Sequence, residues 1–175
     1  MLKLPIHHST RFLLVSPHYP ENVGACARAM KTMGFTRLGL VSPGRIAQPD
    51  HEMAVKMAVK SLDVLGQAEL FDNLDEATVG ASLVAATTAR RGVSGVMSPR
   101  EVAARALEVA ARGQQLCIVF GNEKTGLSRE ELARAEVMVR IPMAADQPSV
   151  NLAQAVQIVA YELFAAALAQ RGSDA

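Results

Sequence analysis

Short apolar runs typical of β-strands alternate with helical patterns along the whole chain of 175 residues. The apolar runs predict strands at 11–16, 37–41, 69–71, 82–87, 116–120 and 137–141. The intervening segments predict helices at 20–33, 50–60, 98–111 and 149–170, with a helical turn at 74–79. This alternation is typical of an α/β fold, in which a mostly parallel sheet carries helices on both faces.

Two of the helix starts have clear capping signals. Ser98 with Glu101, and Ser128 with Glu131, follow the pattern of a capping box, in which each side chain bonds the other residue's backbone N–H. The run LCIVF (116–120) lies between them and is apolar at every position. Such a run is typical of a strand that is buried on both sides of a sheet.

The composition excludes several classes of protein. Half of the residues are hydrophobic, and there are only two cysteines, Cys26 and Cys117, with no histidine ligands near them. We therefore expect one globular domain with reduced thiols, no disulfide framework and no metal site. The most apolar stretch, 152–168, is interrupted by Gln154, Gln157 and Glu162, so we expect no membrane span and a cytoplasmic protein.

The charge is unevenly distributed, although the net charge is only +1. Residues 1–60 contain eight basic and three acidic side chains, and the rest of the chain contains ten and fourteen. This excess of positive charge is either a surface for a polyanion or an accident of surface composition.

In a parallel sheet, ligands bind beyond the carboxyl ends of the strands. The loop after 116–120 reads GNEKTGLS and lacks the lysine directly after the second glycine that a phosphate-binding P-loop requires. No G-x-G-x-x-G follows the first strand, which disfavours a nicotinamide cofactor. The loop is either a glycine-bracketed turn or a ligand site containing Glu123.

Two more segments carry polar residues at predicted helix starts. In 20–35, Asn22 begins a helix, Arg28 and Lys31 share one face of it, and small residues allow another backbone to approach. That face either is solvated or contacts phosphate. In 141–156, Ser149 or Asn151 is either the cap of the last helix or part of a site.

Taken together, the three segments resemble the SpoU (TrmH-like) branch of the SPOUT RNA methyltransferases. The resemblance is carried by N-x-G-x-x-x-R (22–28), F-G-N-E-x-x-G-L (120–127) and I-P-M-x-x-x-x-x-S-V-N-L-A-x-A-V (141–156). Within that branch the chain is most similar to the TrmJ/LasT-type tRNA/rRNA methyltransferases. The similar stretches are ARAMKTMGF (27–35), LVSP (40–43), TTAR (87–90), VFGNEKTGL (119–127) and AVQIVAYE (155–162).

The resemblance implies transfer of a methyl group from S-adenosyl-L-methionine to a ribose 2′-hydroxyl of RNA, which leaves S-adenosyl-L-homocysteine. It further implies a deep trefoil knot near the C-terminus, whose loops hold the cofactor. The matching cofactor positions are Thr87, Thr88, Ala89, Gly121, Ile141, Pro148, Ser149 and Val150. At Gly121 we expect the missing Cβ to let the ligand lie against the backbone.

The resemblance places the family's catalytic arginine at Arg28 and its polar pair at Ser149 and Asn151, with Asn22 and Glu123 at the remaining motif positions. It implies a homodimer, tRNA as the first choice of substrate and rRNA as the second. We expect residues 1–175 to form a single methyltransferase domain without the C-terminal extension that many TrmJ-type enzymes carry. The alternative is a non-catalytic RNA- or cofactor-binding protein with the same fold.

Overall fold

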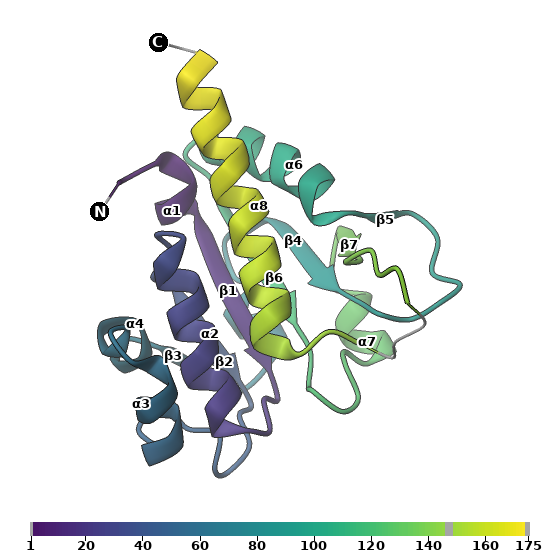
Figure 1. The fold of residues 1–175 in the computed structure, drawn as a ribbon. Coiled ribbons are helices and arrows are strands. Elements are labelled where there is room, and N and C mark those ends of the chain that lie inside the picture. The colour runs from purple at the N-terminus through teal and green to yellow at the C-terminus, as the bar shows by residue number, and fades with distance from the viewer. Residues whose placement is uncertain (1, 146–148, 174–175) are drawn as a thin grey trace.

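Seven parallel strands form one sheet in the computed structural model, which describes residues 2–145 and 149–173 (Figure 1). The strand order is β3-β2-β1-β6-β4-β7-β5. Every paired neighbour runs parallel, so the predicted parallel sheet is confirmed. In chain order the strands are β1 (Thr10–Val15), β2 (Leu38–Val41), β3 (Glu69–Phe71), β4 (Ala81–Thr87), β5 (Val96–Met97), β6 (Gln115–Phe120) and β7 (Val137–Val139).

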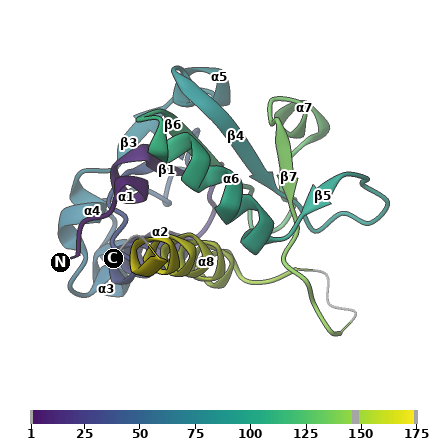
Figure 2. The same cartoon turned by 90° about the horizontal axis from the view of Figure 1, so that it is seen from above.

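Helices cover both faces of the sheet, as predicted, but unequally (Figure 2). The larger apolar core lies between the sheet and the longer helices, and the smaller one lies between the sheet and α5 and α7. The helices are α1 (Pro5–Ser9), α2 (Pro20–Thr32), α3 (Glu52–Ala58), α4 (Leu62–Gly66), α5 (Leu74–Ala77), α6 (Pro99–Ala111), α7 (Arg129–Leu132) and α8 (Leu152–Ser173).

Local signals predicted most of these elements. Both capping boxes are present, at the starts of α6 and α7. The run at 116–120 forms most of β6, whose side chains there are buried between the two layers of helices. Both cysteines are free and buried, as expected. The trefoil knot that the resemblance implies stays a prediction.

Three short elements were not predicted from the sequence, namely α1, α4 and β5. They have five, five and two residues, too few for a hydrophobic period to be recognised. β5 lies within the glycine-bearing segment 91–97 and pairs with β7 through Val96 opposite Met138 and Met97 opposite Val139. The last helix begins at Leu152 rather than at Ser149.

The last helix packs as a core helix. Leu152–Gly172 has a mean hydropathy of 1.5, so by length and composition alone it is apolar enough to cross a membrane, despite its polar interruptions. The core helix of a soluble protein meets the same criterion. Here α8 lies against α2 and α6 and buries Val156, Val159 and Leu163 completely.

The small residues of α2 bring a second helix close to it, as the sequence suggested. A Cβ added to Gly24 would lie 2.0 Å from the carbonyl oxygen of Ala54 in α3. The backbones of the two helices therefore touch at this point. Because α2 also carries Asn22 and Arg28, this contact helps to fix the helix that presents them.

We predict that Gly24→Ala lowers the free energy of unfolding by about 2 kcal/mol, because α3 must move to admit the methyl group. Urea denaturation measures this loss. Gly66→Ala is the matched control, since a Cβ at Gly66 in α4 meets nothing within 4 Å. We expect Gly66→Ala to be neutral or slightly stabilising. Equal effects of the two substitutions would contradict the close contact.

Candidate active site

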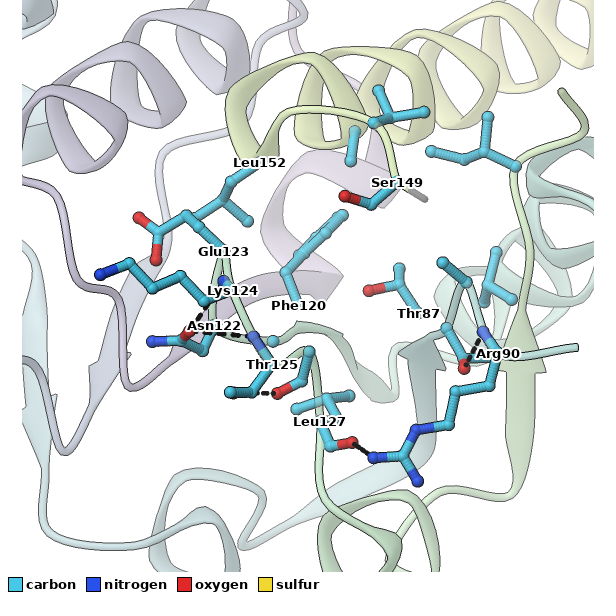
Figure 3. A pocket seen from close by; sticks show the side chains of 18 of the residues that line it. Thr87, Arg90, Phe120, Asn122, Glu123, Lys124, Thr125, Leu127, Ser149 and Leu152 are labelled. Atoms are coloured by element: carbon cyan, nitrogen blue, oxygen red, sulfur yellow. Dashed lines mark hydrogen bonds between the residues drawn. The ribbon is translucent and has the colours of Figure 1, made fainter. Parts of the chain in front are cut away.

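A pocket of about 320 Å³ opens at the carboxyl ends of β4, β6 and β7 (Figure 3). Its wall comes from the loop after β4, the loop after β6, and the segment that joins β7 to α8. The lining residues are 87–90, 120–127, Val139, Ile141, Met143, Ser149, Val150, Leu152 and Ala155. TTAR (87–90), the loop at 120–127 and the segment from 141 to 155, all of which were singled out in the sequence, therefore contribute to one cavity.

Most residues predicted to hold a cofactor line this pocket. They are Thr87, Thr88, Ala89, Gly121, Ile141, Ser149 and Val150. Pro148 lies outside the described residues. Glu123 lines the pocket as well, whereas Asn22, Arg28 and Asn151 do not.

The loop after β6 is folded tightly on itself. The Asn122 side chain accepts hydrogen bonds from the backbone N–H groups of Lys124 (2.8 Å) and Thr125 (3.2 Å), and its amide donates to the Ser16 carbonyl (2.7 Å). A Cβ on Gly121 would lie 2.4 Å from the backbone of Gly126 and Leu127. This glycine therefore allows the loop to close on itself, and the approach of a ligand at Gly121 stays a prediction.

The Glu123 carboxylate joins the loop after β6 to the start of α2. It accepts hydrogen bonds from the backbone N–H of His18 (2.8 Å), the backbone N–H of Tyr19 (3.2 Å) and the side-chain amide of Asn22 (3.0 Å). Burial alone would raise the pKa of Glu123, but these hydrogen bonds outweigh it and hold the pKa below the usual value of 4.5. A carboxylate stabilised in this way holds its neighbours in place and is a weak base.

Asn151 is the cap of the last helix, one of the roles that the sequence left open. Its side-chain oxygen accepts from the backbone N–H of Ala153 (2.9 Å) and so caps α8. Its amide also donates to the side-chain oxygen of Asn22 (3.2 Å). A chain of hydrogen bonds therefore runs from Asn151 through Asn22 to Glu123 and connects all three motif segments.

The basic face predicted on α2 is smaller than the sequence suggested. Lys31 donates to the Lys60 carbonyl (2.9 Å) and is ion-paired with Asp63 (2.5 Å). Arg28 is exposed, and within the described residues no hydrogen bond or ion pair engages its guanidinium. Six residues of helix separate it from Asn22, roughly 9 Å along the axis.

One residue of the pocket wall, Arg90, was not predicted to belong to the site. Its guanidinium donates to the Leu127 carbonyl (2.8 Å) and so ties the loop after β4 to the loop after β6 (Figure 3). The Arg90 carbonyl in turn accepts a hydrogen bond from Arg140. The stretch TTAR contained the signal, because an arginine directly after three pocket residues is well placed to reach a neighbouring loop. Within the described residues no cluster of His, Cys, Asp or Glu is arranged for a metal ion.

Comparison with known proteins agrees with the resemblance found in the sequence motifs. The sequence model of the SpoU rRNA Methylase family matches residues 9–161. A curated relative from Sodalis glossinidius (strain morsitans), the tRNA (cytidine/uridine-2′-O-)-methyltransferase TrmJ, is 39% identical over 170 residues. These residues cover 96% of this chain and 65% of that protein. The chain thus spans slightly less than two thirds of the length of that relative.

Solved structures share the fold. A methylase family protein from Neisseria gonorrhoeae superposes with a TM-score of 0.86 at 36% identity, covering 94% of this chain and 85% of that one. The SpoU methyltransferase AviRb from Streptomyces viridochromogenes, solved in complex with its cofactor AdoMet, superposes with a TM-score of 0.69 at 24% identity. That match covers 93% of this chain and 60% of AviRb, and at this identity it shows the fold alone.

We predict that Glu123→Gln lowers the free energy of unfolding at pH 7 by about 1 kcal/mol, because the new amide faces backbone N–H donors with a donor of its own. A group whose pKa is lowered by folding stabilises the fold above its usual pKa, and this contribution is lost as the pH falls through the lowered value. The difference between wild type and variant should therefore shrink below about pH 4.5.

Thermal or urea denaturation at pH 7 and pH 4 tests this prediction. Glu130→Gln removes an exposed carboxylate that follows the same loop and serves as the control. A Glu123→Gln protein that is as stable as the wild type at pH 7 would show that the carboxylate does not hold the three segments together.

Proposed function

The chain belongs to the SpoU rRNA Methylase family, and on this basis we propose that it methylates a ribose 2′-hydroxyl of RNA with S-adenosyl-L-methionine as methyl donor. tRNA is the proposed substrate class, with rRNA second. The observation that carries the proposal is a pocket lined by two of the three motif segments, to which the third is joined by the hydrogen bonds of Asn22 with Glu123 and Asn151. The substrate class is supported by the TrmJ relative, whose name specifies tRNA and the 2′-oxygen.

The pocket fits the proposed donor in size and chemistry. Its volume lies at the lower end of the range for small-molecule sites. Phe120, Leu127 and Leu152 offer apolar surface to a purine ring, and the backbone of the surrounding loops offers donors and acceptors to its edge. Glu123 adds a negative charge at the wall, which suits a sulfonium. When bound, S-adenosyl-L-methionine supplies a methyl group on a positively charged sulfur.

Arg28 and Ser149 are the residues that we propose act on the RNA. The 2′-oxygen gains a bond to the methyl carbon as the bond from that carbon to sulfur breaks, and its proton passes by way of Ser149 to solvent. The oxygen must therefore be held in line with the donor, and its developing charge must be stabilised. An arginine stays protonated at neutral pH and is therefore poorly suited to act as a base. We assign Arg28 to binding of the nucleotide phosphate and stabilisation of this charge. Ser149, exposed on the pocket wall, accepts the hydrogen bond of the 2′-hydroxyl.

Asn22, Glu123 and Asn151 have a different role in this proposal. All three are engaged with one another or with backbone N–H groups. They are therefore positioning residues, which fix the start of α2, the loop after β6 and the start of α8 relative to the pocket. Asn151 acts on Ser149 indirectly, because it caps the helix that begins at Leu152, three residues after Ser149.

We further propose that two copies of the chain associate through α8. Tyr161 and Leu168 are 54% and 45% exposed, and Ile158 and Ala165 continue the same face at helical spacing. An exposed apolar stripe on a packed helix is typical of a protein interface. A homodimer that works on tRNA belongs in the cytoplasm, without attachment to a membrane.

The enzymatic proposal predicts transfer of labelled methyl from S-adenosyl-L-methionine into bulk tRNA, with 2′-O-methylnucleosides after digestion. Arg28→Lys should lower kcat by at least about tenfold, because an ammonium lacks the two-pronged geometry of the guanidinium. Lys56→Gln, a change of an exposed lysine on α3, is the control. Cofactor binding without a 2′-O-methyl product from any tRNA or rRNA would favour a binding protein instead. Near-normal turnover by Arg28→Lys would remove the role assigned to Arg28.

The dimer proposal predicts about twice the monomer mass in size-exclusion chromatography with light scattering at micromolar concentration. The double variant Tyr161→Asp, Leu168→Asp should elute as a monomer, because the carboxylates would be desolvated at the interface. Leu62→Asp, at a residue that is 50% exposed on α4, should leave the mass unchanged. A stable wild-type monomer would contradict the dimer.

A further inference from the structure

Tyr19 exposes an aromatic ring beside the candidate active site. Three of the five phenylalanines are fully buried, and the other two are half-buried. The two tyrosines, by contrast, are 40% and 54% exposed, Tyr19 at the start of α2 and Tyr161 on α8. The Tyr161 ring lies on the proposed dimer face, and the Tyr19 ring contacts His18 and Lys124.

The neighbours of the Tyr19 ring are polar and exposed. The His18 ring packs edge-on against it, with the two centroids 4.7 Å apart and the planes at 87°. The Lys124 ammonium lies 5.4 Å from the centroid of Tyr19 and 3.2 Å from Nε2 of His18. Because an ammonium can only donate, Lys124 is the donor in this contact. The cluster thus combines an aromatic surface with one positive charge.

This cluster is attached firmly to the site. The backbone N–H groups of His18 and Tyr19 are the two that Glu123 holds, and Lys124 follows Glu123 in the loop. Lys124 itself lines the pocket, and Figure 3 shows it extending beside Asn122 and Glu123. The ring and the ammonium therefore lie at the rim of the pocket. The hydrogen bond from Tyr19 to Glu123 is made by the backbone N–H of Tyr19, so the aromatic ring is not needed to hold this segment in place.

We propose that Tyr19 is a stacking platform for a base of the RNA substrate, and that Lys124 binds an adjacent phosphate. The inference rests on the proposed function and adds to it how the nucleotide is oriented. Bases in RNA loops can be splayed out and stacked on aromatic side chains, and every base offers a π-face for this contact. A stacked base would fix the rotation of the nucleotide, so that its 2′-hydroxyl points at the pocket. An aromatic ring stacks on any base. Tyr19 would therefore orient the nucleotide and would discriminate little between bases.

The test compares Tyr19→Ala, Tyr19→Phe, Lys124→Gln and the control Lys56→Gln in the full chain. The Kd for bulk tRNA is measured by fluorescence anisotropy over a range of salt concentrations, the Kd for S-adenosyl-L-methionine by calorimetry, and KM and kcat with labelled donor. We expect Tyr19→Ala to raise the Kd and the KM for tRNA about tenfold, which corresponds to about 1.4 kcal/mol and is the size of one stacked base. Tyr19→Phe keeps the ring and should stay within about twofold of the wild type.

The remaining measurements separate the proposal from simpler effects. Lys124→Gln should reduce the slope of log Kd against log salt by about 0.7 to 1, the share of one phosphate, whereas Tyr19→Ala should leave that slope unchanged. Neither Tyr19→Ala nor Tyr19→Phe should change the Kd for S-adenosyl-L-methionine by more than about twofold. The platform is wrong if Tyr19→Ala binds tRNA like the wild type, if Tyr19→Phe is as weak as Tyr19→Ala, or if donor binding falls equally.

The proposed function can fail without deciding the platform. A wild-type chain that binds tRNA but forms no 2′-O-methylnucleoside would overturn the enzymatic proposal, and the anisotropy comparison of Tyr19→Ala with Tyr19→Phe would still decide whether the ring stacks on RNA.

Discussion

The Glu123 carboxylate is the interaction on which the candidate active site depends. It accepts hydrogen bonds from two backbone N–H groups before α2 and from Asn22 within it, and Asn22 in turn holds Asn151 at the start of α8. The loop after β6 is also joined to the N-terminal segment by the hydrogen bond from Asn122 to the Ser16 carbonyl and by the contact of Lys124 with His18. Among these contacts, the Glu123 carboxylate is the one that engages both the residues before α2 and α2 itself.

Local patterns were sufficient to predict the sheet and the longer helices, whereas the predicted cofactor residues of the pocket came from the family resemblance. Capping boxes and apolar runs are read within a few residues, whereas α1, α4 and β5 are too short to have a period. The contacts between Asn22, Glu123 and Asn151 join residues 101 and 129 positions apart, so only the family resemblance indicated them. For Gly121 the structure adds a constraint that the sequence did not indicate, since a side chain there would meet the backbone of Gly126 and Leu127.

Charge counting overstated the surface that the first 60 residues offer to a polyanion. Arg11 is ion-paired with Glu69, Lys31 with Asp63, and Arg37 donates to the His8 carbonyl. Arg11 and Lys31 are thus paired with acidic residues from later in the chain, and Arg37 is hydrogen-bonded to a backbone carbonyl. Within the described residues, the cations that line the pocket are instead Arg90 and Lys124, which lie in the acidic part of the sequence. The uneven totals are therefore a poor guide to where positive charge is available.

The long sequence separations within the site have a consequence for biosynthesis. β1 pairs with both β2 and β6, and Phe12 lies opposite Ile118 of β6. β1 therefore has both of its neighbouring strands only after Ile118 has been translated. The hydrogen bond between Asn22 and Asn151 can form only later, after Asn151 has been translated. A nascent chain can therefore gather its first strands and helices while the pocket remains incomplete, since non-local contacts form only after the intervening chain exists. The pocket is complete only after α8 has been translated and has packed against α2 and α6.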